Sequence, residues 1–161
     1  MKKYLALLAK LETAMKVLAA CCLMGMTLLT GADVLGRGTL NIPIFGSEEI
    51  VTILATLAIG LSLPYAHSQR VHIGVEIVVR RFSRRTRDII KLLTDLAALA
   101  LFTLVCWRMA IYATTLRQAG TVSMNLELPE YYVVYVLGFG FMVFALNLLG
   151  DVLSFFNKDG E

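Results

Sequence analysis

The chain has 161 residues, of which 58% are hydrophobic and 17% are charged, and its formal net charge is +3. Soluble domains carry about 45–50% apolar and about 25% charged residues, so this composition indicates a membrane protein that crosses the bilayer several times. The basic residues lie between apolar stretches rather than on a polar fold, which argues against nucleic-acid binding. The three cysteines all lie in apolar stretches without metal-binding spacing, so we expect neither a zinc site nor a structural disulfide.

Residues 2–16 predict an amphipathic helix. Its apolar side chains recur at helical spacing, and Lys10 and Glu12 lie off that stripe. Such a segment either lies in the headgroup plane or simply extends the first span. The uncharged run 17–32 is longer than the core of a signal peptide and is followed by no small-residue cleavage pattern, so we expect it to be retained.

The first two spans are predicted at residues 17–35 and 48–66. At ~1.5 Å per residue, the first reaches about 28 Å, close to the hydrocarbon thickness of about 30 Å. Glycine, asparagine and proline between residues 36 and 46 predict a turn, so the two spans form an antiparallel hairpin. Ser47 is the predicted N-cap of the second span, and Gly60 is a predicted position for close helix packing.

Residues 67–88 form the longest polar connection and predict a second interfacial amphipathic helix, because an isolated strand there would leave its edges unpaired. Its basic side chains are candidate ligands for anionic lipid headgroups and also set the topology. These candidates are Arg80, Arg81, Arg84, Arg85 and Arg87. The two histidines, His67 and His72, lie in one connection rather than on facing helices, so we expect them to pack at the interface and not to hold haem.

The third and fourth spans are predicted at residues 89–111 and 129–155, with a belt of tyrosines at the start of the fourth. The predicted fold is therefore an all-α integral membrane protein, a single domain of four transmembrane helices with an N-terminal and a central interfacial helix. Twelve of the fifteen Lys and Arg residues lie on the side of the termini, and Arg37, Arg108 and Arg117 lie on the other. Because positive loops stay in the cytoplasm, both termini are predicted to be cytoplasmic.

Four charged residues converge at the predicted outer end of the first hairpin: Asp33, Arg37, Glu48 and Glu49. We interpret them as a candidate docking surface for a partner subunit, the alternative being helix capping and local ion pairing. The sequence holds no nucleophile–base pair, metal-ligand cluster or phosphate-binding loop, so it predicts no catalytic activity and no cofactor. No charge is predicted at mid-membrane, which favours an accessory subunit over a carrier.

Several motifs, taken in order, resemble the small permease subunit (DctQ type) of tripartite ATP-independent periplasmic (TRAP) transporters. They are DVLGR at 33–37, FGSEEIVTILATLAIGLSLPYA at 45–66, HIGVE at 72–76 and LELPEYYVVYVL at 126–137. Glu76 stands where aspartate is usual in the family, and Gly38 where an aromatic residue is common.

The resemblance implies a multi-pass protein of a bacterial or archaeal cytoplasmic (inner) membrane. Its partners would be a large permease subunit and a periplasmic substrate-binding protein. The large subunit would carry organic acids coupled to sodium, and this chain would be its static scaffold and part of the docking platform.

Two other classes of membrane protein remain as alternatives. A self-sufficient four-span exporter needs a glutamate embedded in the membrane, whereas Glu48 and Glu49 lie at a helix start and Glu76 lies outside the spans. A membrane anchor of a redox enzyme needs facing haem ligands, which two histidines in one connection do not supply.

Overall fold

The computed structural model describes residues 2–69 and 84–158, and this part of the chain is helical. The helices are α1 (Lys2–Leu35), the π-helix η1 (Gly36–Leu40), α2 (Ser47–Ser68), α4 (Arg84–Ala119) and α5 (Tyr131–Lys158). Four helices are long and apolar enough to cross a membrane. The prediction of an all-helical chain with four helices able to span a membrane is therefore confirmed.

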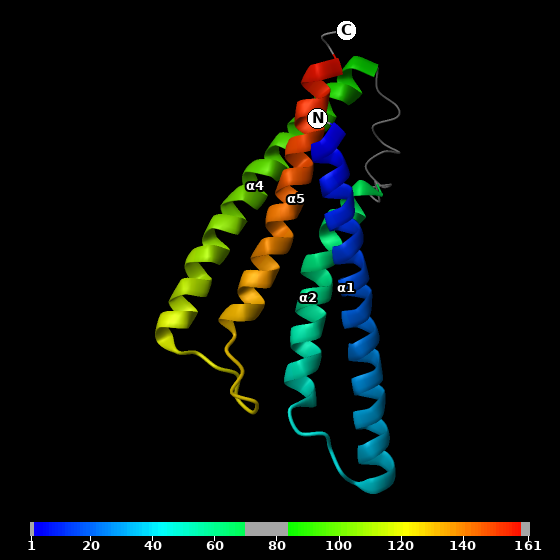
Figure 1. The fold of residues 1–161 in the computed structure, drawn as a ribbon, viewed down its shortest axis with the longest axis vertical. Coiled ribbons are helices and arrows are strands. Elements are labelled where there is room, and N and C mark those ends of the chain that lie inside the picture. Colours follow the sequence, from blue (N-terminus) through cyan, green and yellow to red (C-terminus); the bar gives the residue numbers. More distant parts are fainter. Residues whose placement is uncertain (1, 70–83, 159–161) are drawn as a thin grey trace.

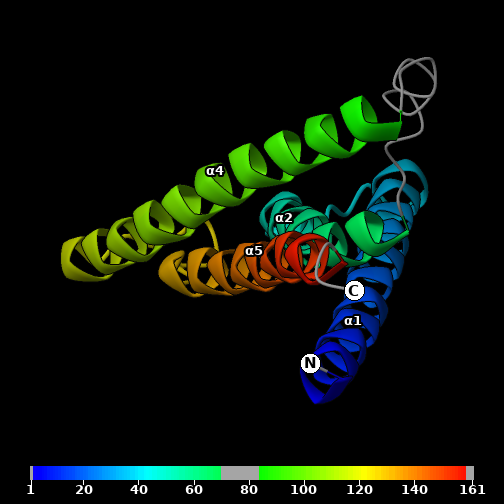
Figure 2. The ribbon, with the colours of Figure 1, turned by 90° about the horizontal axis from the view of Figure 1, so that it is seen from above.

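The helices form two antiparallel hairpins that meet through α2 and α5. α1 packs on α2 and α4 packs on α5, while α2 and α5 contact each other between them (Figures 1 and 2). We call the end that carries the turns 41–46 and 120–130 the hairpin end. The opposite end, where residues 2, 68, 84 and 158 lie, is the terminal end.

α1 is one continuous helix of 34 residues, about 51 Å at ~1.5 Å per residue. No glycine or proline interrupts residues 2–24, and most of these residues are good helix formers. Residues 2–16 are therefore the first part of α1 rather than a separate element, in agreement with the second of the two predicted alternatives.

The tightest contact between the hairpins is the crossing of α2 and α5 at two glycines. Pro64 of α2 has no N–H to donate to the Gly60 carbonyl, and this carbonyl lies against Gly140 of α5. A Cβ on Gly140 would come within 2.5 Å of the Gly60 oxygen. The predicted close approach at Gly60 is thus present, and its partner is a glycine of α5.

A small apolar core lies beside this crossing, where α1, α2 and α5 meet. It consists of Met15, Ala19, Leu61 and Val143, with Leu57 packed against them. By contrast, none of residues 86–112 in α4 is buried. Wide apolar faces of the outer helices are consequently left uncovered by the chain itself.

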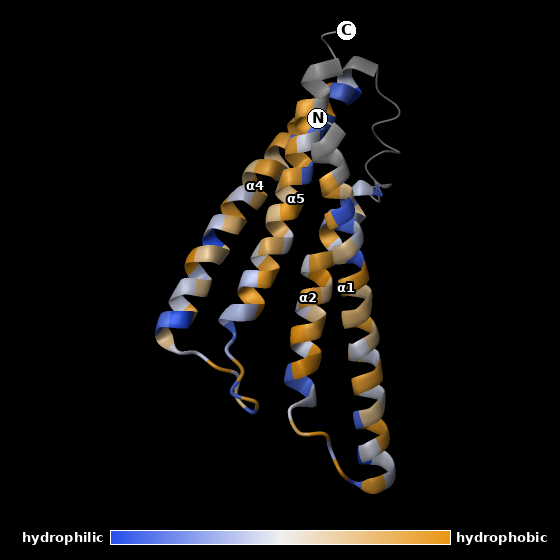
Figure 3. Cartoon of the chain, viewed as in Figure 1, coloured by the Kyte–Doolittle hydropathy of each residue, from blue (hydrophilic) through white to orange (hydrophobic). Residues whose placement is uncertain are grey.

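Polar residues bound an apolar band of similar thickness in α1 and α2. Figure 3 shows hydrophobic residues along the middle of the helices and hydrophilic residues toward the hairpin ends of α2 and α4. Lys16 and Asp33 in α1 are seventeen residues apart, about 26 Å along the helix axis. Glu49 and His67 in α2 are eighteen residues apart, about 27 Å. Both distances match a hydrocarbon layer of about 30 Å.

Candidate functional site

Asp33 is the buried centre of a polar group at the hairpin end of α1. Its Oδ2 accepts a charged hydrogen bond from Arg37 Nε at 2.8 Å, one helical turn away. Its Oδ1 accepts the backbone N–H of Ile44 at 2.7 Å. The second bond ties the end of α1 to the turn that leads into α2. Asp33 therefore fixes the turn and orients the arginine at the same time.

Arg37 lies in η1, which lengthens the first helix where the sequence predicted a turn. The helical part ends at Asn41, whose left-handed φ of 55° lets its N–H bond to the Gly36 carbonyl. A Cβ on Gly36 would lie 2.8 Å from the Ile42 oxygen, so a glycine is needed at this position. The end of α1 at Leu35 agrees with the predicted span, but the chain stays helical to Leu40, so the turn predicted for 36–46 occupies only residues 41–46.

Arg37 also reaches across the turn to α2. Its Nη2 lies 3.6 Å from Glu48 Oε1, and the two side chains are 49% and 86% exposed. Such an exposed, long contact adds little stability. The two groups therefore present opposite charges at the surface of the hairpin end.

Glu49 turns away from this group and binds the other hairpin. Its Oε1 accepts the backbone N–H of Asn125 at 2.7 Å and the side-chain Nδ2 of the same residue at 2.9 Å. Its Oε2 accepts the N–H of Leu126 at 3.1 Å. The Leu126 side chain packs against Gly46, where any Cβ would lie within 2.8 Å of it. Glu49 thus fastens the 120–130 loop to the start of α2.

The 120–130 loop has its own internal support. Gly120, with a φ of 64°, closes the end of α4, and Val122 pairs with Pro129 in an isolated β-bridge. Ser123 donates its N–H to the Leu128 carbonyl at 3.0 Å and accepts the Leu128 N–H on its hydroxyl at 3.2 Å. A folded loop of this kind presents a defined surface at the start of α2, where Glu49 holds it.

The sequence-predicted group of four is therefore only partly assembled. Asp33, Arg37 and Glu48 come together, as predicted, whereas Glu49 contacts a loop 76 residues further along the chain. The N-cap of α2 is Gly46, in a left-handed conformation, and Ser47 is already helical and makes no side-chain cap. The capping prediction for Ser47 was wrong: the cap position is taken by Gly46, which has a φ of 72° and no Cβ that would meet Leu126.

A second polar contact joins α2 and α5 near the terminal end. His67 Nε2 lies 3.1 Å from Asp151 Oδ2, with the two side chains 14% and 46% exposed. The His67 ring also meets the edge of Phe144 at a centroid distance of 5.2 Å. Sequence reasoning assigned His67 to interfacial packing and missed this partner. In the sequence, the presence of Asp151 in the otherwise apolar α5 segment was a signal that could have indicated a partner for His67.

Two further polar groups lie close to this contact along the helices. Lys16 of α1 places its Nζ 4.3 Å above the Tyr65 ring of α2, a cation–π contact. The Nδ2 of Asn147, one turn before Asp151, is buried, and no hydrogen-bond partner for it is found in the described part of the chain. In residues 2–69 and 84–158, no group of three or more His, Cys, Asp or Glu side chains is placed to hold a metal ion.

Comparison with protein families then decides the identity of this four-helix arrangement. A sequence model described as "Tripartite ATP-independent periplasmic transporters, DctQ component" matches residues 26–158, most of the chain. The chain belongs to this family. The resemblance drawn from the short motifs is therefore confirmed, and the family is a transporter component and not an enzyme family. Comparison with curated proteins finds no match.

The DctQ match includes both polar contacts between the hairpins, since Glu49, Asn125, His67 and Asp151 all lie within residues 26–158. It leaves out residues 1–25, of which 2–25 belong to α1 and form its part on the terminal side. The membership identifies the chain as the small membrane subunit of a TRAP transporter, a multi-pass membrane protein. The exporter and redox-anchor alternatives are thereby set aside.

The predicted lipid-binding arginines are only partly within the described residues. His72, Glu76, Arg80 and Arg81, together with most of the predicted central interfacial helix, lie outside them. Arg84, Arg85 and Arg87 belong to the first turn of α4, and the Arg87 side chain is exposed. α4 thus begins within the arginine cluster, five residues before the predicted span.

Proposed function

We propose that the chain is the static scaffold of its transporter, a single four-span domain that supports a large permease subunit and helps to dock a periplasmic substrate-binding protein. The transporter takes up organic acids with sodium across a bacterial or archaeal cytoplasmic membrane. Family membership supports the assembly with two partners, because the family is that of a tripartite transporter.

The observation that carries the scaffold role is a band without charge. Residues 17–32, 50–66, 96–107 and 131–150 contain no Asp, Glu, Lys or Arg. Binding of an organic anion or a sodium ion in a membrane needs charged groups, unwound backbone or broken helices near the midplane. The transport path therefore belongs to the partner subunit.

The open faces of α4 and α1 support a large membrane partner. The exposed apolar side chains on α4 include Leu93, Leu101, Leu104 and Trp107. Lipid covers such a face as readily as protein does, so exposure alone does not choose between them. If the chain is a scaffold, part of this exposed apolar face contacts the large subunit.

The exposed charges of the hairpin end supply the docking surface for the periplasmic protein. In this proposal Arg37 and Glu48 face the partner, and Asp33 and Glu49 hold the two turns in register beneath them. The positive-inside rule places the hairpin end in the periplasm and both termini in the cytoplasm. The arginines at the start of α4 then face anionic headgroups of the cytoplasmic leaflet.

The test of the assembly is affinity purification of the tagged chain from membranes that also contain the large subunit. We expect one much larger membrane protein to co-purify in stoichiometric amount. Recovery of the chain as a free monomer or a homodimer, with the large subunit present in the extract, contradicts the scaffold role.

The docking role is tested on the intact complex with Arg37→Gln and Glu48→Gln. Binding of the periplasmic protein to complexes in nanodiscs should weaken in both variants, while the large subunit still co-purifies. Glu127→Gln, an exposed carboxylate of the 120–130 loop, is the matched control. Unchanged binding in the first two variants would contradict the docking role and would mean that Arg37 and Glu48 only form a local ion pair.

A further inference from the structure

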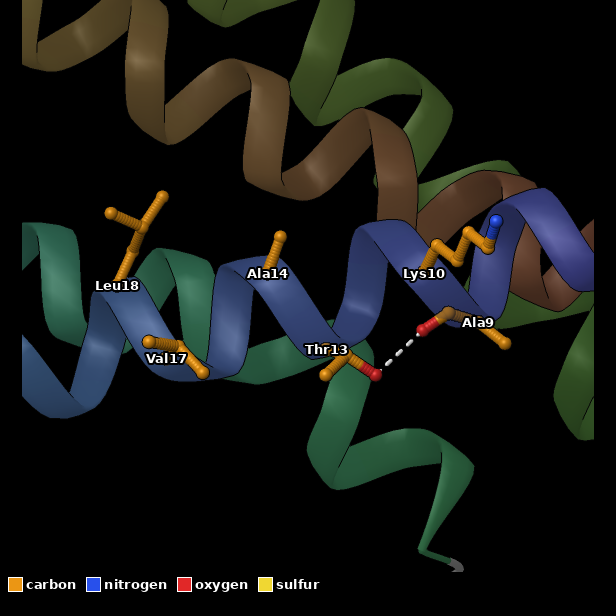
Figure 4. A pocket seen from close by; sticks show the side chains of 6 residues that line it. All are labelled: Ala9, Lys10, Thr13, Ala14, Val17 and Leu18. Carbon is orange, nitrogen blue, oxygen red and sulfur yellow. Dashed lines mark hydrogen bonds between the residues drawn. The ribbon is translucent and has the colours of Figure 1, made fainter.

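The exposed side of α1 near the terminal end carries a shallow, widely open groove lined by six side chains of this one helix. Figure 4 shows its lining side chains, which form two neighbouring rows along the helix. Within each row, successive residues are four positions apart in the sequence. The rows are Ala9, Thr13 and Val17 in one and Lys10, Ala14 and Leu18 in the other. Small side chains in the middle leave the hollow, and the Thr13 hydroxyl donates to the Ala9 carbonyl at 2.8 Å. The groove is therefore apolar along its length, with a cation near one end.

The other side of α1 is already occupied by the bundle. Leu8, Met15 and Ala19 are buried there against the rest of the chain. The groove thus lies on a face that the fold does not cover. It also lies outside residues 26–158, so the DctQ match does not account for it.

The groove straddles the edge of the apolar band. Lys16 contacts Tyr65 close to the level of the His67–Asp151 pair, which bounds the charge-free band on the terminal side. Lys10 lies six residues further out, about 9 Å along the axis. The headgroup layer is about 5–7 Å thick on each side of the hydrocarbon. The Lys10 backbone therefore lies at the outer edge of the headgroup layer, from which its long side chain can reach the phosphates. Leu18 lies about 3 Å inside Lys16, at the level of the acyl chains.

The charge of the groove also has one sign. Lys10 is exposed, and no ion pair to it is found in the described part of the chain. The neighbouring Glu12 is not among the lining residues, and Lys16 is engaged with Tyr65. A positive head followed by an apolar channel complements a negative headgroup followed by an acyl chain.

We propose that this groove binds one anionic phospholipid of the leaflet on the terminal side, with its phosphate on Lys10 and an acyl chain along Ala14 and Leu18. A transmembrane helix of a partner is the other possible occupant. It would provide a counter-charge for Lys10 only if it carried an acid at headgroup level, whereas an anionic lipid brings its phosphate to that level by its own structure. A lipid provides both a negative phosphate for Lys10 and an apolar chain for the rest of the groove.

The test uses the full chain in micelles that contain equal amounts of phosphatidylglycerol and phosphatidylcholine, followed by native mass spectrometry of retained lipid. We expect the chain to retain phosphatidylglycerol preferentially. Lys10→Gln should lower the phosphatidylglycerol-to-phosphatidylcholine ratio about five-fold, the effect of about 1 kcal/mol for one lysine at an anionic surface. Lys91→Gln removes an exposed lysine of α4 outside the groove and should leave the ratio nearly unchanged.

A second pair of variants tests the apolar part without altering charge. Ala14→Phe fills the groove and should reduce retained phosphatidylglycerol, whereas Ala20→Phe, at an exposed position outside the groove, should not. Equal losses in Lys10→Gln and Lys91→Gln overturn the proposal in favour of diffuse surface charge. Unchanged lipid retention in Ala14→Phe overturns the lipid assignment. Loss of the large subunit in affinity purification of the same variant from membranes would identify the groove as a helix-packing face instead.

Discussion

Glu49 and Asn125 are 76 residues apart in the sequence and lie in different hairpins, yet the Glu49 carboxylate accepts both the backbone and the side-chain N–H of Asn125. A third bond from Leu126 completes the contact. Three donors on one carboxylate hold an irregular loop in a single place relative to α2. The hairpin end of the molecule therefore behaves as one surface rather than as two separate turns.

Glu49→Gln should loosen this loop, because a glutamine side chain has one acceptor oxygen and offers an N–H where the loop also presents N–H groups. Hydrogen exchange of the Asn125 and Leu126 amides should become faster, without loss of the α2 helix. Glu48→Gln is the matched control, since Glu48 is largely exposed and makes only a long contact with Arg37. Equal exchange in both variants would mean that Glu49 does not hold the loop.

Asp33→Ala should destabilise the chain more than Arg37→Ala. Removal of the carboxylate leaves the Ile44 N–H and the guanidinium without their partner, at a cost of about 1–3 kcal/mol. Loss of the half-exposed Arg37 side chain should cost less than about 1 kcal/mol. The free energy of unfolding in mixed micelles measures both values. The reverse order would show that the ion pair, and not the bond to Ile44, secures the turn.

The number of candidate spans could be predicted from the sequence, because each one is a single continuous apolar stretch of sufficient length. The Asp33–Arg37 pair followed for the same reason, since one helical turn separates the two residues. The helical segment Gly36–Leu40 after α1 was not predicted, because glycines at 36 and 38 are turn signals that a π-helix tolerates.

The contacts between the hairpins were beyond reach of the sequence. The Glu49–Asn125 and His67–Asp151 pairs depend on how α2 and α5 cross, and this crossing is set by Gly60 and Gly140 rather than by any charged motif. A single sequence offers no signal that couples positions so far apart. Only the N–H missing at Pro64 hinted that the Gly60 carbonyl needed a neighbour.

Gly140→Ala should separate α2 from α5, because the new Cβ would meet the Gly60 backbone, which cannot rotate away. We expect a loss of about 1–3 kcal/mol in the free energy of unfolding, as for overpacked sites. Gly138→Ala is the control: its Cβ would lie 3.6 Å from Met109, an ordinary contact. That variant should be neutral or up to about 1 kcal/mol more stable, since alanine favours the helix. Similar losses for both variants would point to a general need for glycine in α5.

His67 and Asp151 should be energetically coupled, because their side chains meet at 3.1 Å and His67 is largely buried. His67 also packs on Phe144, so a single substitution mixes the loss of the pair with a loss of packing. A double-mutant cycle with His67→Gln and Asp151→Asn removes this ambiguity, and we expect a coupling of about 0.5 kcal/mol or more. The unfolding free energies of the four proteins supply the cycle. Strict additivity of the two substitutions would show that packing of the imidazole on Phe144, rather than its contact with Asp151, links the terminal ends of α2 and α5.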